Sequence, residues 1–348
     1  MQALANASAH IDPARLGQRG PRPGGVRSTT VADPGDRDRS LPIDVWYPAR
    51  ETHAASAADA SQWAAHPFHQ PHRALADAAP SSATAPLVLF SHGNSGLRQQ
   101  STFLTTHLAS WGFVVAAPDH VGNTFAEMQG IDDERRKDMH RAARVARPND
   151  LVATLDHVVA LAAAADGQLP PVRADRVAAL GHSFGGWTAL KMPARDARFG
   201  AVCALAPAAE PFVGRRAFAE GDLPLPRATP ALLAAGMEDV LVELEASVLS
   251  LFRRLVDPRA VIGIEGADHF HFCDGIPLLH GVHEATPRPG LQQSVRPYAE
   301  LLDEATAHRV LCHVVTAFLD RALLSDDDPC AAFRDATAWR GTPVRPLG

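Results

Sequence analysis

The sequence has little of what nucleic-acid-binding or membrane-spanning proteins need. Only 2 of its 348 residues are tyrosine and the aromatic fraction is 6%, which argues against a platform that stacks on bases. Asp and Glu number 39 against 33 Lys and Arg, and no dense basic block offsets the net charge of -6. Nucleic acid and anionic membranes are therefore poor partners. No apolar run approaches the ~18 residues of a membrane span.

Cysteine is also scarce, and its spacing excludes several uses. None of the four cysteines forms a CxxC pair, which excludes a zinc ribbon and a thioredoxin-type motif. We expect reduced, buried thiols, with a Cys273–Cys312 pair as the alternative. The first 25 residues contain no apolar run of signal-peptide length, so the expected location is cytoplasmic.

The chain instead has the composition of a globular protein, with 46% hydrophobic and 21% charged residues. From residue 86 onward, short apolar runs alternate with helical segments. The runs are as apolar as strands buried on both faces, which predicts an α/β fold with a mostly parallel central sheet and helices on both faces. The predicted strands are 86–91, 113–117, 176–180, 201–205, 231–235 and 260–264.

Local composition predicts how the chain is organised on either side of these strands. Residues 1–25 are interpreted as a flexible leader and 26–324 as one domain, followed by a C-terminal tail over 325–348. Within the domain, 51–85 is expected to be a surface-loop insertion and 122–148 a charged segment where a cap or lid would sit. A long helix capped at Asn149 or Asp150 is expected to follow.

The strongest motif is Gly181-His182-Ser183-Phe184-Gly185, a G-x-S-x-G pattern that follows an apolar strand and opens a helix. A tight turn there exposes the serine hydroxyl above the sheet edge, and the small residues make room for the turn. The helix N-terminus adds partial positive charge beside a developing oxyanion. Ser183 is therefore the predicted nucleophile.

A second motif, Ser91-His92-Gly93-Asn94, ends the strand over 86–91. A loop at this place supplies a backbone N–H to an oxyanion. We expect the N–H groups of Asn94 and Phe184 to form the oxyanion hole, with His92 bracing the loop. His182 and Trp187, which flank the nucleophile, are the expected substrate contacts.

A serine nucleophile needs a base in a loop after the last strand. The segment Gly266–Phe270 follows the strand over 260–264 and contains His269, the predicted base. His271 is the rival. The clustered residues His269, His271, Cys273 and Asp274 also suggest a zinc site, but the triad explains His269 better. The histidines His66, His69 and His72 suggest another, but the prolines between them argue against a common helical face. No metal is therefore expected.

The orienting carboxylate belongs in the loop after the preceding strand. There the sequence reads Gly236-Met-Glu-Asp239, and Asp239 is the predicted acid. Glu238 and Glu210 remain open as alternatives.

Six stretches are informative when they are taken together: Leu41–Pro48, Pro86–Gly93, Leu108–Asp119, Arg147–Asp150, Gly181–Gly186 and Gly266–Phe270. These blocks resemble α/β-hydrolases of the bacterial dienelactone-hydrolase-like and platelet-activating-factor-acetylhydrolase-like branch, and the resemblance runs from about residue 26 to 324. It implies a serine esterase with the α/β-hydrolase fold and no cofactor, and Ser183 and His269 carry over directly.

Two departures from the family limit what is carried over. Dienelactone hydrolases proper use a cysteine nucleophile, so their substrate is not assumed. Eukaryotic platelet-activating-factor enzymes take the acid from the strand after the nucleophile helix, but the stretch 201–207 here has no Asp. The acid therefore falls on Asp239, as in cutinase-like polyester hydrolases.

The predicted function is hydrolysis of a small-molecule carboxylic ester through an acyl-enzyme, by a Ser-His-Asp triad. Amide or thioester hydrolysis and acyl transfer use the same triad and remain alternatives. A non-catalytic binding protein on the same fold is a further alternative.

Overall fold

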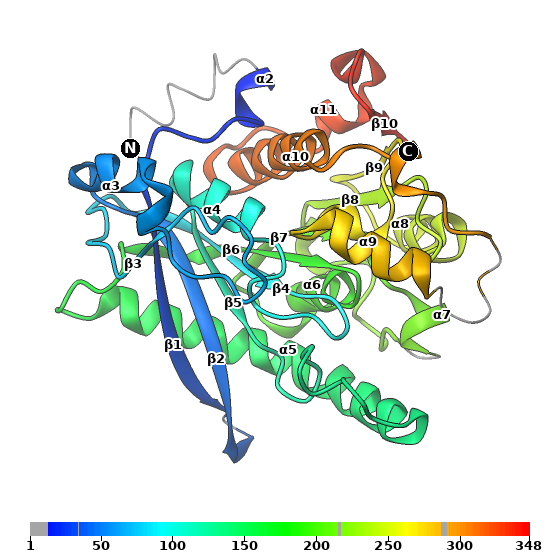
Figure 1. Cartoon of the computed structure of the whole chain (residues 1–348), viewed down its shortest axis with the longest axis horizontal. Coiled ribbons are helices and arrows are strands. Elements are labelled where there is room, and N and C mark those ends of the chain that lie inside the picture. The colour runs from blue at the N-terminus through cyan, green and yellow to red at the C-terminus, as the bar shows by residue number, and fades with distance from the viewer. Residues whose placement is uncertain (1–12, 34, 215–216, 287–290, 292) are drawn as a thin grey trace.

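The computed structural model describes residues 13–33, 35–214, 217–286, 291 and 293–348, which form a 10-stranded sheet flanked by helices (Figure 1). From one edge to the other, the strand order is β10 (Val344–Pro346), β9 (Arg259–Ile264), β8 (Ala231–Gly236), β7 (Phe199–Leu205), β6 (Val172–His182), β4 (Ala85–Ser91), β5 (Val114–Pro118), β2 (Asp36–Pro48), β1 (Gly24–Asp33) and β3 (Leu75–Ala76). Every strand predicted from the apolar runs is present.

The middle of the sheet is parallel, and antiparallel pairs lie toward its edges. Strands β4 to β9 pair in parallel, whereas β2 is antiparallel to β5 and β10 is antiparallel to β9. On β4, Leu87 and Leu89 pack into the core on one face while Val88 and Phe90 pack into the core on the other. Both faces are covered, which explains why the strands are continuously apolar.

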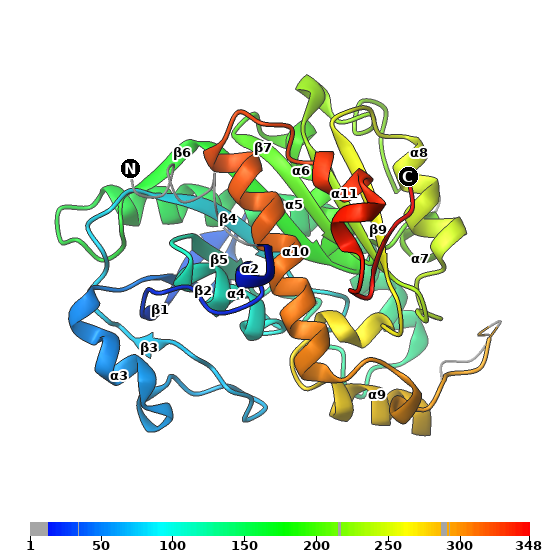
Figure 2. The same cartoon turned by 90° about the horizontal axis from the view of Figure 1, so that it is seen from above.

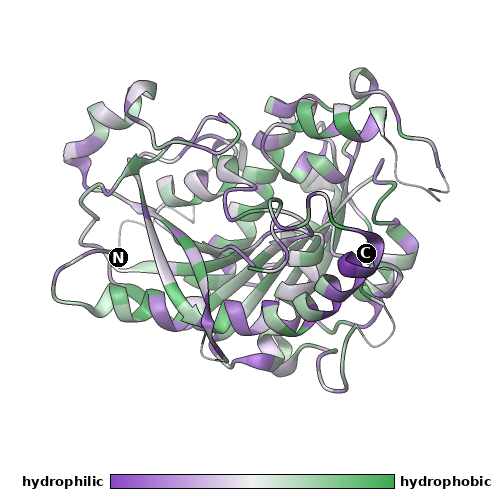
Figure 3. Cartoon of the chain, turned by 60° about the horizontal axis from the view of Figure 1, so that its bottom comes forward, coloured by the Kyte–Doolittle hydropathy of each residue, from purple (hydrophilic) through white to green (hydrophobic). Residues whose placement is uncertain are grey.

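Helices cover the two faces of the sheet. Helices α5 (Asp133–Ala163) and α6 (Phe184–Arg195) bury residues in one core, and α4 (Thr102–Ser110) and α10 (Glu304–Leu324) bury residues in the other. Figure 2 shows α10 lying across its face of the sheet, with the short helix α2 (Pro13–Leu16) beside it. Hydrophobic residues concentrate along the strands between these helix layers (Figure 3).

Helix α5 begins earlier than the sequence predicts. It is a single helix of 31 residues that runs through Pro148, and the expected cap at Asn149 or Asp150 is wrong. The side chain of Asp132 accepts a hydrogen bond from the backbone N–H of Arg135 and caps the helix there. The second half of the predicted cap segment is therefore the first half of α5.

The remaining segments add smaller elements. The insertion over 51–85 contains the short helices η1 (Glu51–His53), α3 (Ala54–Ala58) and η2 (Ala60–Gln62), and it ends after β3. The segment 325–348, which the sequence alone leaves as a tail, contributes α11 (Ala331–Arg334), η7 (Ala336–Trp339) and the edge strand β10.

Several sequence expectations concern parts of the chain outside this sheet. Residues 1–12 of the predicted leader lie outside the described residues. Cys273 and Cys312, considered as a pair, are both free and buried. Among the described helices, none is long and apolar enough to cross a membrane.

Candidate active site

Ser183 occupies a strained turn between β6 and α6. Its backbone has φ 57° and ψ −118°, a conformation that an L-residue rarely adopts. A Cβ added at Gly181 would lie 2.1 Å from the carbonyl oxygen of Gly185, and one added at Gly185 would lie 1.8 Å from the carbonyl oxygen of Ser91. Only glycine fits at both positions, so the G-x-S-x-G spacing follows from the packing of this turn against the end of β4.

The structure brings Ser183, His269 and Asp239 together. His269 Nε2 lies 2.9 Å from Ser183 Oγ, and His269 Nδ1 lies 2.7 Å from Asp239 Oδ2. The other oxygen of Asp239 accepts hydrogen bonds from the backbone N–H groups of Leu241 and Val242, both at 2.8 Å. With Asp239 held in this way, His269 donates from Nδ1, and its Nε2 is free to accept the serine proton.

The rival acids and the rival base have other partners. Glu238 forms an ion pair with Arg296 at 2.8 Å, and Glu210 forms one with Arg254 at 2.7 Å. His271 is fully buried, and its Nε2 donates to the carbonyl oxygen of Leu302 at 2.8 Å. Neither alternative acid therefore takes the place of Asp239 beside His269.

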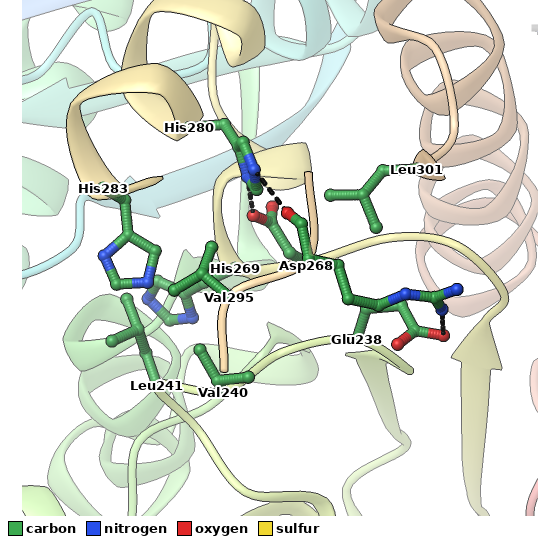
Figure 4. A pocket seen from close by; sticks show the side chains of 10 residues that line it. Glu238, Val240, Leu241, Asp268, His269, His280, His283, Val295 and Leu301 are labelled. Atoms are coloured by element: carbon green, nitrogen blue, oxygen red, sulfur yellow. Dashed lines mark hydrogen bonds and ion pairs between the residues drawn. The ribbon is translucent and has the colours of Figure 1, made fainter. Parts of the chain in front are cut away.

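Asp268, next to His269 in the chain, anchors the surrounding turn. Its two oxygens lie 2.6 Å from His271 Nδ1 and 2.5 Å from His280 Nδ1, and Figure 4 shows His280 directed at it. Burial alone would raise the pKa of Asp268, but its close contacts with His271 and His280 lower that pKa to about 2. The charged carboxylate thereby ties the His269 turn, η5 (His269–Phe272), to helix α9 (Ile276–Ala285).

The residues considered as metal ligands have protein partners, and His66 Nε2 lies 3.6 Å from Asp274 Oδ2. Asp274 accepts hydrogen bonds from the backbone N–H groups of Thr102 and Phe103 at 2.6 and 2.9 Å. His66 Nε2 lies 3.0 Å from the carbonyl oxygen of Gln99. In the part of the chain that the structure describes, no three or more His, Cys, Asp or Glu side chains are grouped so as to hold a metal ion.

The predicted oxyanion donors lie on the two segments that meet at Ser183. Phe184 is the first residue of α6, so its N–H has no partner within the helix. A Cβ added at Gly93 would lie 3.5 Å from Ser183 Cβ, which places the loop of Asn94 beside the serine. Asn94 also lines the cavity that contains Ser183. Their role as donors stays a prediction.

The two predicted substrate contacts lie in different surroundings. His182 lines the cavity, and its ring centroid is 4.6 Å from that of His269. Burial holds the pKa of His182 well below its usual range, so it places no charge beside His269. Trp187 is buried in the core, where its Nε1 donates to the carbonyl oxygen of Ala217 at 2.9 Å. The structure does not bring Trp187 to the cavity, because α6 turns this side chain into the core between helix and sheet.

Arg147 is a residue near the site to which the sequence analysis gave no role. It is fully buried and donates to the carbonyl oxygens of His92 and Gly93 at 2.6 and 2.9 Å. The available signal was the block Arg147–Asp150, which carried part of the family resemblance. An arginine inside a block shared with the family is a signal from which a contact with the site could have been inferred.

Ser183 and His269 open into a cavity of about 570 Å³, within the range typical of small-molecule sites. Most of its wall is apolar. The apolar lining residues include Phe68, Phe125, Phe212, Leu241, Val242, Phe270, Leu278, Leu279 and Val282.

Comparisons with known proteins show what the chain is similar to. A family model described as Chlorophyllase matches residues 51–217, a range that includes Ser183 but ends before Asp239 and His269. The platelet-activating factor acetylhydrolase of Canis lupus familiaris is 28% identical over 146 residues, covering 33% of this chain. The match spans about a third of that relative, 33% of its length.

A solved structure extends the similarity to nearly the whole chain. Ferulic acid esterase from Streptomyces cinnamoneus matches with a TM-score of 0.65 and 21% identity, over 94% of this chain and 97% of that chain. The chain has the α/β-hydrolase fold. The matching relative is named as an acetylhydrolase, and the matching structure is named as an esterase.

Proposed function

We propose that this protein is a serine hydrolase that cleaves carboxylic esters through an acyl-enzyme. The observation that carries the proposal is the hydrogen-bonded chain from Ser183 through His269 to Asp239, at the wall of a cavity large enough for a small-molecule ester. This arrangement of nucleophile, base and orienting acid is that of serine hydrolases on several unrelated folds. The esterases among its relatives support the choice of an ester as substrate.

In the first half of the reaction, Ser183 Oγ attacks the ester carbonyl carbon while His269 Nε2 takes the hydroxyl proton. The tetrahedral intermediate then collapses, and the bond to the alkoxide breaks as His269 returns the proton to it. In the second half, His269 deprotonates a water molecule that attacks the acyl carbon. The carboxylic acid leaves, and the proton returns to Ser183. Asp239 holds the imidazole in the productive tautomer throughout.

The carbonyl oxygen gains negative charge in both tetrahedral intermediates. We assign the backbone N–H groups of Asn94 and Phe184 to its stabilisation, since they lie on the two segments that meet at Ser183. His182 lines the same cavity and is assigned to substrate contact. Because the two backbone N–H groups are already in position before the reaction begins, they stabilise the negative charge as it develops.

A fluorophosphonate probe and p-nitrophenyl butyrate test the proposal together. The probe is expected to modify the peptide that contains Ser183, and it should abolish p-nitrophenol release in proportion to labelling, because both reactions need the activated serine. EDTA is expected to leave the rate unchanged, since the serine route uses no Lewis acid. Absence of both labelling and turnover in the folded protein would contradict the proposal.

A further inference from the structure

Large apolar side chains are exposed around the cavity. Six large hydrophobic residues among those described are exposed, and four of them line the cavity: Phe68, Phe125, Leu278 and Val282. Their exposed fractions run from 39% to 60%. Exposed apolar residues scattered singly need no explanation, but a group around one concave site marks a place where an apolar ligand binds.

The four residues form two walls. Leu278 and Val282 are four positions apart on α9 and therefore lie on one face of that helix. Phe68 and Phe125 contact each other edge to face, with ring centroids 5.4 Å apart. Phe68 comes from the insertion over 51–85, and Phe125 comes from the loop that precedes α5. The insertion over 51–85 and the loop before α5, which are far apart in sequence, therefore form one aromatic wall.

The α9 wall is fixed relative to the candidate base. His280 lies between Leu278 and Val282 in sequence but is buried, and it bonds to Asp268, the neighbour of His269. The close-up in Figure 4 shows this link from α9 to the turn that carries His269. An apolar group held against α9 is thus held at a set distance from the reacting atoms, as productive positioning requires.

Resting on the proposed function, we infer that Phe68, Phe125, Leu278 and Val282 form a binding site for an extended alkyl or aromatic group of the ester. The protein then prefers esters with long apolar groups over acetyl esters of small alcohols. The apolar group can belong to the acyl part or to the alcohol part, and both present the same chemistry to these walls.

Two series of esters test this preference. In p-nitrophenyl esters from acetate to octanoate, or in alkyl acetates from ethyl to octyl, kcat/KM is expected to rise about twofold to fourfold per methylene, the upper value corresponding to full burial of a CH2 group. The series that shows the rise identifies the part of the ester that the walls hold. A flat profile in both series, with the acetyl esters still turned over, would overturn the inference.

Variants connect the preference to these residues. The double variant Leu278→Ser with Val282→Ser, and separately Phe68→Ser, are expected to flatten the rise, because a hydroxyl-bearing side chain gains little from contact with CH2 groups. Val256→Ser is the matched control, since Val256 is exposed to 47% and does not line the cavity. An equal rise in the wall variants and the control would contradict the assignment.

Calorimetry separates this inference from the proposed function. Octyl acetate is expected to bind the Ser183→Ala variant with a negative heat-capacity change, the mark of apolar burial, and to bind the Leu278→Ser, Val282→Ser form of that variant at least tenfold more weakly. Binding that depends on the walls, together with no ester turnover by the unsubstituted protein, would support the apolar site and refute the hydrolase. Equal binding by both forms would refute the site.

A different observation concerns Arg147. Besides the two carbonyl oxygens, its guanidinium donates to Asn123 Oδ1 at 2.6 Å from Nη2, and Asn123 Nδ2 donates to Asn94 Oδ1 at 3.0 Å. The guanidinium carbon lies 4.4 Å from the ring centroid of Phe184. One buried cation thus holds the loop of Asn94 and packs on the residue that follows Ser183.

The charge on Arg147 persists in this site. Burial lowers the pKa of Arg147 to about 9, which leaves the guanidinium protonated at neutral pH. The planar guanidinium of Arg147 can donate to two adjacent carbonyl groups at once, whereas a compact ammonium group such as that of lysine fits this geometry less well. We propose that Arg147 is a positioning residue, which sets the angle between the Asn94 and Phe184 N–H groups at the oxyanion.

Arg147→Lys and Arg147→Met test this role. Both are expected to lower kcat about 100-fold with KM changed less than threefold, because the N–H groups act on the transition state. Affinity for phenylboronic acid, which forms a tetrahedral serine adduct, should fall in parallel, while affinity for benzoate should not. Arg144→Met is the control, since Arg144 lies on the same helix and donates to the carbonyl oxygen of Val213.

Thermal melting separates positioning from folding. If the Met variant fails to fold, the Lys variant, which keeps the buried cation, carries the test. A folded variant of either kind with unchanged kcat and unchanged boronic acid affinity would overturn the role. So would equal losses of affinity for the boronic acid and for benzoate.

Discussion

Ser183→Ala is expected to lower kcat for ester hydrolysis by about four to six orders of magnitude. Ser183 Oγ forms the bond to the acyl carbon, and among the residues that the structure describes no other hydroxyl forms a hydrogen bond with His269 Nε2. The fold should be nearly unaffected, because the serine side chain is small and alanine can adopt the same backbone conformation at a similar energetic cost. Steady-state kinetics on p-nitrophenyl butyrate, with melting temperatures of both proteins, measure the two effects.

The control for this variant is Ser247→Ala. Ser247 is also buried, but it does not line the cavity, so its loss should leave kcat unchanged. The fluorophosphonate probe should label the control and fail to label Ser183→Ala. A Ser183→Ala protein that retains more than a tenth of the activity would rule out Ser183 as the nucleophile.

Asp239→Asn is expected to lower kcat about 10⁴-fold, with little change in stability. The new amide can still accept the backbone hydrogen bonds from Leu241 and Val242 through its oxygen. Its nitrogen then faces His269 Nδ1 and donates to it, which selects the tautomer with the proton on Nε2. That tautomer cannot accept the proton of Ser183, so the nucleophile is no longer activated.

Glu238→Gln is the matched control, because Glu238 is the neighbouring carboxylate and is paired with Arg296. It should change kcat less than threefold. Glu210→Gln, which breaks a partly exposed pair with Arg254, should behave in the same way. A larger loss of kcat in either control than in Asp239→Asn would show that Glu238 or Glu210, and not Asp239, is the orienting acid.

The parallel core of the sheet was predictable because its signal is local. Strands such as β4 and β8 are buried on both faces, and a short continuous apolar run is the consequence in sequence. The turn at Ser183 was equally predictable, because its G-x-S-x-G motif is also a local signal. The clash distances at Gly181 and Gly185 show that the motif is a steric requirement of the turn and not a coincidence of composition.

The structure of segments with weaker local sequence signals was predicted less accurately. The start of α5 depends on a cap at Asp132, inside the charged segment assigned to a cap or lid, and the helix continues through Pro148, where a helix would ordinarily end. The pairing of β10 with β9 joins residues that are about eighty positions apart, so nothing near Val344 indicates it. Trp187 was expected at the cavity because it is close to Ser183 in sequence, but the rotation of α6 directs it into the core.

The sequence by itself determined the order of strands and helices and singled out Ser183 and His269, because these follow from apolar runs and short motifs whose physics is local. The sequence favoured Asp239 as the acid but left Glu238 and Glu210 open. Only the tertiary structure shows that Asp239 lies beside His269, since that depends on which carboxylate reaches Nδ1 across two loops. It also decided that Phe68, Phe125 and α9 enclose one cavity and that Arg147 reaches the Gly93 carbonyl. These contacts join residues from separate segments, and no pattern within any one segment encodes them.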